Sequence, residues 1–124
     1  MAYTVIYDAD QHLMRVRAWG QDRIDDWLDA KSELLRIHEA HGVNILLVDV
    51  RQQETSPDLF DILDFGDTWP SSIRVALLVS RNTPKDMLYL ETVALQRGKQ
   101  IRIFFGEPEA LAWLAGESAK SVDD

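Results

Sequence analysis

IRIFFGEPEALAWLAG, residues 101–116, is the stretch of sequence that decides the fold. It joins a short apolar segment, Ile101–Phe105, to a short helix over Glu109–Ala115 that Pro108 opens. The apolar side chains of this helix recur at helical spacing and should pack back on a sheet: Leu111, Trp113 and Leu114. A strand followed by a covering helix is the unit from which α/β folds are built.

The N-terminal segments predict a β-hairpin. Tyr3–Tyr7 and Leu13–Trp19 are both β-prone, and the second alternates apolar and polar residues. The turn Asp8–His12 is too short for anything but an antiparallel connection.

A helix is predicted from about Arg23 to His41, with Asp22 as N-cap and Gly42 ending it in a left-handed conformation. The next segment, Val43–Val50, is apolar on both sides, which is typical of a central parallel strand covered on its two faces.

A second helix is predicted to begin with Ser56 as N-cap and Pro57 at its first position, and to end at Gly66. Ile73–Val79 is then the next strand. Thr83-Pro84 repeats the cap-plus-proline opening for a third helix, which should run to Arg97 and stop at Gly98.

The predicted architecture is therefore α/β: a five-stranded mixed sheet flanked by four helices, in the order β-β-α-β-α-β-α-β-α. The hairpin is antiparallel, and the helical connections make the remaining strands parallel. We expect one domain over residues 1–116 and a polar, frayed tail over residues 117–124.

Composition excludes several classes of function. The chain has 124 residues, a net charge of −8 and no cysteine. The charge disfavours nucleic acid and anionic membranes, and the lack of thiols excludes disulfides and thiolate-bound metals. The apolar runs are too short to span a bilayer and the first ten residues do not resemble a secretion signal, so we expect no membrane insertion and a cytoplasmic location.

The order of elements resembles the fold of the sulfate-transporter/anti-sigma-factor-antagonist (STAS) domains and their simplest form, the SpoIIAA-like proteins. Ala110, Trp113 and Leu114 match an Ala-x-x-Trp-Leu-like signature in the final helix of many SpoIIAA-like sequences, and NILLVDVR, residues 44–51, fits the strand that ends in aspartate. The resemblance spans about Tyr3–Leu114 and implies a non-enzymatic interaction or ligand-sensing module.

Signalling members of that family carry an Asp-Ser-type loop whose serine is phosphorylated. This chain has DVRQQETSPDLF, residues 49–60, in its place, so the Asp-Ser pair is absent and the loop is longer. Ser56, with Thr55 beside it, is the nearest equivalent of the regulated serine. Its other interpretation is a plain N-cap.

Basic residues follow two of the predicted strands, where parallel sheets bind ligands. Arg51, Arg81 and Lys85 could form a small anion pocket together with Ser56 and Thr55. The alternative is that they are solvated basic side chains of an acidic protein. Asp49, at the end of a buried strand, should be partly enclosed, with a raised pKa or a hydrogen bond to a neighbouring loop.

The third helix is apolar over more than one face. One face must pack on the sheet, and Leu88, Tyr89 and Leu95 are candidates for an interface with a second copy or another protein. Trp69 could join that surface or lie against the core. His38 and His41 are three residues apart and do not match the zinc-protease spacing, so they carry no metal prediction.

No nucleophile elbow, phosphate loop or cofactor motif is present, so we expect neither catalysis nor a cofactor. The first functional hypothesis is a regulatory or protein-interaction module that forms a homodimer. The second is a carrier or sensor of an apolar, lipid-like ligand held between the sheet and the helices. A cavity of a few hundred cubic ångströms would favour the second hypothesis, and a solid core with an exposed apolar helix the first.

Overall fold

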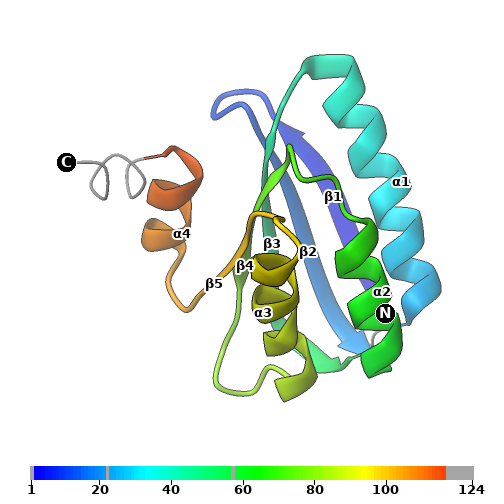
Figure 1. Cartoon of the computed structure of the whole chain (residues 1–124). Helices are drawn as coiled ribbons and strands as arrows, with labels where there is room; N and C mark the ends of the chain where they lie inside the picture. Colours follow the sequence, from blue (N-terminus) through cyan, green and yellow to red (C-terminus); the bar gives the residue numbers. More distant parts are fainter. Residues whose placement is uncertain (1, 22, 57, 117–124) are drawn as a thin grey trace.

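A five-stranded sheet forms the centre of the computed structural model, which describes residues 2–21, 23–56 and 58–116. Its strands follow one another in chain order from edge to edge (Figure 1): β1 (Ala2–Asp8), β2 (Leu13–Gln21), β3 (Ile45–Thr55), β4 (Arg74–Leu78) and β5 (Ile101–Phe104). The first two strands are antiparallel, and every other neighbouring pair is parallel. The mixed sheet predicted from the sequence is therefore confirmed.

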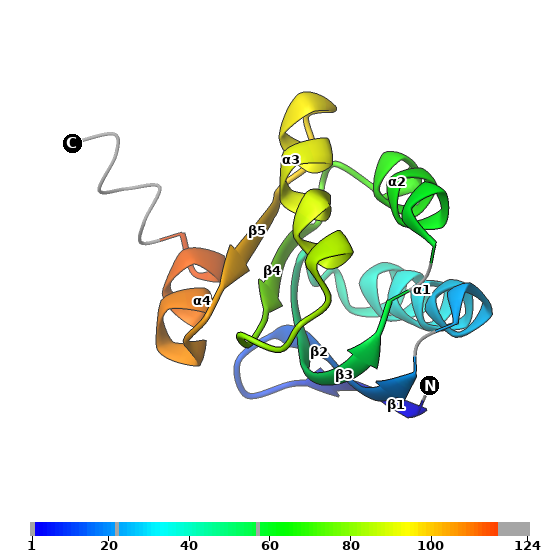
Figure 2. The same ribbon diagram turned by 90° about the horizontal axis from the view of Figure 1, so that it is seen from below.

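Three helical connections cover one face of the sheet, and the last helix covers part of the other (Figure 2). The helices are α1 (Ile24–His41), α2 (Leu59–Thr68), α3 (Tyr89–Gln96), preceded by the 3₁₀ turn η1 (Lys85–Leu88), and α4 (Glu107–Leu114). Because β2 to β5 are added in one direction, right-handed crossovers place α1, α2 and α3 on the same side. The described part of the chain thus contains the four predicted α-helices.

The core has two layers, one on each face of the sheet. Beneath α1, α2 and α3 lie two adjoining clusters, which include Met14, Leu46 and Trp69 in one and Trp27, Ile62 and Met87 in the other. The opposite face is buried where α4 packs over β3, β4 and β5, and this cluster also includes Leu13 at the start of β2. Within the described residues, the rest of the outer face of β1 and β2 stays open.

The start of α2 differs from the prediction. The N-cap is Asp58, whose carboxylate accepts a hydrogen bond of 2.8 Å from the backbone N–H of Phe60, and Ser56 lies two residues before it. A serine before a proline predicts a cap at Ser56, but aspartate caps helices equally well, and Asp58 is the residue at the observed helix start. Asp22 and Pro57, predicted as a cap and a first helical residue, lie outside the described residues.

Gly66 was also assigned wrongly, since α2 continues through it to Thr68. A β-carbon at Gly66 would meet Leu90 Cδ2 at 3.3 Å, so this glycine allows α2 and α3 to approach each other closely. By contrast, Gly42 has φ 66° and its N–H donates to the His38 carbonyl, which confirms the predicted end of α1.

The third predicted helix is divided into η1 and α3, and Thr83 does not cap it. The Thr83 hydroxyl instead accepts a hydrogen bond of 2.9 Å from the backbone N–H of Ser80, which closes the preceding turn. A 3₁₀ turn at a helix start is common because it tightens the first hydrogen bonds. The predicted tail, residues 117–124, lies outside the described residues.

Candidate functional site

The first candidate site lies within β3, because this strand continues to Thr55 and does not end at Val50 as predicted, and an ion pair already occupies the site. The Arg51 guanidinium donates to both carboxylate oxygens of Asp49, at 3.0 and 2.8 Å, and the Arg51 backbone N–H donates to the same carboxylate at 3.1 Å. The positive charge that the sequence assigned to an anion pocket is thus neutralised by a neighbour two residues away.

The pKa of Asp49 is lowered, which contradicts the prediction that it is raised. Burial does oppose ionisation of this carboxyl, as expected, but the hydrogen bonds and the charge of Arg51 outweigh it. The sequence pattern indicates that Asp49 is enclosed, but not that the Arg51 side chain turns back onto its carboxylate.

The other members of the predicted anion site lie on two separate segments. Thr55 ends β3 and Ser56 follows it, whereas Arg81 is in the turn after β4 and Lys85 begins η1. The turn does approach β3, since the Ser80 hydroxyl donates to the Arg51 carbonyl at 3.3 Å. Arg81 and Lys85 are both exposed. The anion pocket and the regulated Ser56 stay predictions.

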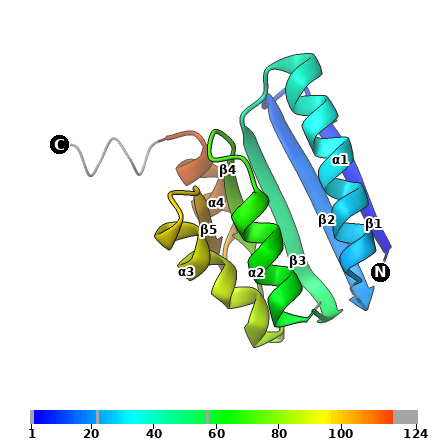
Figure 3. The ribbon, with the colours of Figure 1, turned by 45° about the vertical axis from the view of Figure 1, so that its right-hand side comes forward.

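An exposed apolar stripe on η1 and α3 is the second candidate site. We call Leu88, Tyr89 and Leu95 the α3 stripe; their exposed fractions are 39%, 52% and 80%. The opposite side of the same helix is buried through Leu90 and Ala94. The helix is therefore held firmly on the sheet and on α2 (Figure 3) while three large apolar side chains stay in contact with water.

Trp69 does not belong to this surface. It is 2% exposed, stacks on Phe65 with ring centroids 6.0 Å apart, and belongs to the core. Its indole N–H finds no hydrogen-bond partner in the structure. The alternative that placed Trp69 against the core is therefore the correct one.

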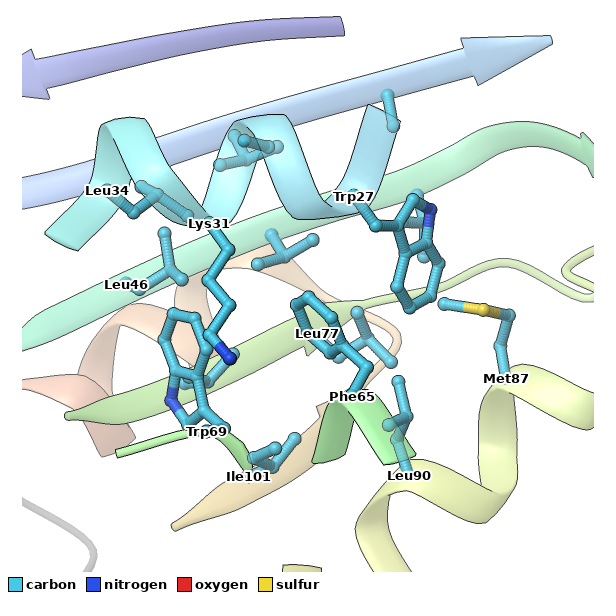
Figure 4. Close-up of a pocket in the computed structure, with 16 residues that line it drawn as sticks. Trp27, Lys31, Leu34, Leu46, Phe65, Trp69, Leu77, Met87, Leu90 and Ile101 are labelled. Atoms are coloured by element: carbon cyan, nitrogen blue, oxygen red, sulfur yellow. The ribbon is translucent and has the colours of Figure 1, made fainter. Parts of the chain in front are cut away.

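A small apolar cavity lies between the sheet and α1, α2 and α3, and is the third candidate site (Figure 4). Its volume is about 80 Å³, well below the ~300–1,000 Å³ of typical ligand sites. It is lined by two tryptophans and by most of the strand side chains on this face: Val16, Ala18, Trp27, Leu46, Val48, Val50, Trp69, Val75 and Leu77. A space of this size and polarity can hold only a small apolar group.

Lys31 is the one charged residue among those lining the cavity, and it is not among the predicted site residues. It reaches from α1 toward Phe65 and Trp69 (Figure 4), and its ammonium donates to the Thr68 hydroxyl at 2.9 Å. Burial lowers the pKa of Lys31. The signal was its spacing, since Lys31 lies four residues after Trp27 on the buried stripe of the helix.

The histidines of α1 have local structural partners. His38 Nδ1 lies 2.8 Å from the Val43 carbonyl, and the His41 ring stacks on Tyr7 with centroids 4.2 Å apart. Within the described residues, no group of three histidine or acidic side chains is placed to hold a metal ion. In the same part of the chain, no helix has the length and apolar character needed to cross a bilayer.

The open face of the sheet holds a shallow concavity of about 190 Å³. Arg15 and Asp49 are among its lining residues, and both are already in ion pairs: Arg15 with Asp8 at 3.1 Å, and Asp49 with Arg51. Arg17 lies beside them and donates to the Gln52 side chain at 2.6 Å. Because Arg15 and Asp49 each have an oppositely charged partner, the concavity does not indicate a ligand of either sign.

Comparison with solved structures supports the fold. The chain is similar to a crystal structure of an uncharacterized protein of the DUF3478 family with a SpoIIAA-like fold, from Shewanella loihica PV-4. The TM-score is 0.61 and the sequence identity 20%, over 91% of this chain and 92% of that one. No family model matches the sequence, and no curated protein is a detectable relative. The fold is therefore SpoIIAA-like, and the likeness extends to the fold alone.

Proposed function

We propose that this chain is a non-enzymatic protein-interaction module, and that it binds a partner protein through the α3 stripe. The observation that carries the proposal is the exposure of Leu88, Tyr89 and Leu95 on a helix whose other side is fully packed. Each large apolar side chain left in water forgoes about 1.5–3 kcal/mol of burial free energy, and three of them on one short segment are typical of a binding surface.

The position of the stripe suits it to docking. Leu88 and Leu95 are seven residues apart, so they project from the same side of the segment, with Tyr89 beside them. Tyrosine is enriched at the centre of interfaces, and the two leucines beside it add apolar area that a partner would bury. Arg97, just after α3, pairs with Asp67 of α2 at 2.7 Å and supplies a polar rim.

The neighbouring helix α2 also exposes a large apolar side chain. Phe60, in the first turn of α2, is 79% exposed, and α2 packs directly beside η1 and α3. A partner that presents an apolar helix or loop of its own would cover this side of the molecule. Asp49 and Arg51, the charged residues of the first candidate site, are paired with each other and give no comparable support to catalysis.

Site-specific photocrosslinking tests this proposal. A photoreactive residue placed at Leu95 in cells of the source organism should capture one defined protein, whereas the same residue at Leu28, which is 47% exposed on α1, should not. With that protein purified, Leu88→Ser and Leu95→Ser should each weaken binding by about tenfold or more, and Leu28→Ser should leave it unchanged. Equal capture at both positions, or none, would reject the α3 stripe as the docking site.

A second candidate function is the binding of a small apolar ligand, and the cavity beneath α1, α2 and α3 supports it. The cavity is lined by aromatic and aliphatic side chains, and Lys31 adds one ammonium at its wall. Its volume of about 80 Å³ is smaller than a lipid-like ligand requires, which is why this function ranks second.

Tryptophan fluorescence tests the second candidate directly, because Trp27 and Trp69 both line the cavity. Titration with short alkanols or benzene should change the emission and raise the melting temperature if the cavity accepts ligands, as dry apolar cavities elsewhere do. No change in either quantity would remove this candidate.

A further inference from the structure

We propose that β1 is a self-pairing edge, and that two copies of this chain join by antiparallel pairing of β1 with β1. Within the described residues, β1 pairs with β2 alone and forms the outer edge of the sheet beside α1 (Figure 3). The other side of the strand therefore presents a row of backbone N–H and C=O groups to a partner.

The edge lacks three of the features that protect natural sheet edges. Proline, lysine and bulges normally block the pairing of exposed strands, and the sequence AYTVIYD of Ala2–Asp8 contains neither of the two residues. Its register with β2 is continuous, without a bulge. Its single charge, Asp8, is already paired with Arg15 at 3.1 Å.

The sequence of β1 is complementary to itself in one register. When a two-fold axis passes through Val5, all seven residues pair, and Tyr3 lies opposite Tyr7 of the second copy. Thr4 then lies opposite Ile6, and Asp8 opposite Ala2, so no like charges meet. Aromatic pairs of this kind across antiparallel strands are favourable.

Charges on α1 favour the same register. Tyr3 lies near the acidic first half of α1, where Asp26, Asp29 and Glu33 all act on its hydroxyl. Tyr7 stacks on His41 at the other end of that helix. Because the two-fold axis sets Tyr7 of one copy beside Tyr3 of the other, each His41 approaches the acidic half of the second copy's α1. An imidazole of one copy therefore faces carboxylates of the other on both sides of the axis.

This assembly is independent of the proposed docking function. The β1 edge and the strand that α3 contacts, β5, are at opposite ends of the sheet (Figure 2). A dimer through β1 leaves both α3 stripes uncovered and would present two copies of the docking surface on one particle. Such a particle could bind a two-fold symmetric partner with increased avidity.

The test uses two double variants of the full chain that differ at one position. Thr4 and Ile6 are both exposed, and on β2 they lie opposite Arg17 and Arg15, so acidic substitutions here suit the fold of each copy. Thr4→Glu with Ile6→Glu sets like charges opposite each other twice across the proposed interface. Thr4→Glu with Ile6→Lys sets opposite charges there instead.

Sedimentation equilibrium should find a dimer for the natural chain. The dissociation constant of the dimer should be about tenfold higher or more for the variant with Thr4→Glu and Ile6→Glu. The variant with Thr4→Glu and Ile6→Lys should regain the dimer. Circular dichroism should be the same for all three. A monomeric natural chain, or equal association of the two variants, would overturn the proposal. So would a dimer that Leu88→Ser dissociates and the variant with Thr4→Glu and Ile6→Glu does not, because its interface would then be the α3 stripe.

Discussion

Filling the cavity should stabilise the protein, and Val48→Ile is the substitution that tests this. Val48 lies in the central strand β3, lines the cavity, and packs against both of the clusters beneath the helices. A cavity of about 80 Å³ costs roughly 1.9 kcal/mol at ~24 cal/mol per Å³. One added methylene group that enters it should recover about 0.8 kcal/mol of the free energy of unfolding. Isoleucine keeps the β-branched shape that suits a strand.

Val43→Ile is the matched control, since the chemical change is the same and the surroundings differ. Val43 is completely buried in one of the same clusters but does not line the cavity. The added methylene group must therefore displace packed neighbours, at a cost of about 1–3 kcal/mol.

Urea unfolding, with a thermal melt as a second measurement, should give opposite signs for the two variants. For Val48→Ile we expect a gain of about 0.8 kcal/mol and a melting temperature raised by about 3–5 °C. A loss of stability in Val48→Ile equal to that in Val43→Ile would show that the space beneath the helices is already filled in solution.

Three further predictions follow from the site geometry. The folded-state pKa of Asp49 is lowered, so its pairing with Arg51 stabilises the protein above about pH 4, and this contribution is lost as the pH falls. The loss of stability caused by Asp49→Asn, measured by urea unfolding at pH 7, should therefore become smaller below pH 4. Asp58→Ala should lower the free energy of unfolding by about 1 kcal/mol because Asp58 caps α2, whereas Ser56→Ala should change it by less than ~0.5 kcal/mol. Equal losses in the two variants would contradict the assignment of Asp58 as the cap. Leu95→Ser should likewise cost less than ~0.5 kcal/mol, whereas Leu90→Ala, at a site 4% exposed, should cost about 2–5 kcal/mol; a large cost at Leu95 would mean that the α3 stripe is packed in solution.

The topology could be predicted from the sequence because each of its determinants is local. The short turn after Asp8 permits only an antiparallel neighbour, and every later connection contains a helix long enough for a parallel crossover. Gly42 ended α1 as predicted, since a left-handed residue has few alternatives to glycine. The breadth of apolar surface on the third helix suggested Leu88, Tyr89 and Leu95 as interface candidates; all three are exposed, and their role as an interface stays a prediction.

The details that failed depend on side-chain contacts that a sequence pattern does not show. Gly66 was taken as a helix end because the approach of Leu90 from α3 cannot be read from α2 alone. The pKa of Asp49 was assigned the wrong direction because burial was visible in the pattern of the strand, and the orientation of Arg51 was not. The sequence of α1 does not distinguish Lys31 from an exposed polar residue, because Phe65 and Trp69, toward which it points, belong to a later part of the chain.

Native mass spectrometry of gently purified protein tests the central claim, that this SpoIIAA-like domain acts through its surfaces and not through a retained small molecule. We predict the mass of the bare chain, in two copies at the concentrations where β1 pairs, with no added mass. A reproducible extra mass per chain, lost in Val48→Ile, would contradict the claim and identify the cavity as the functional site.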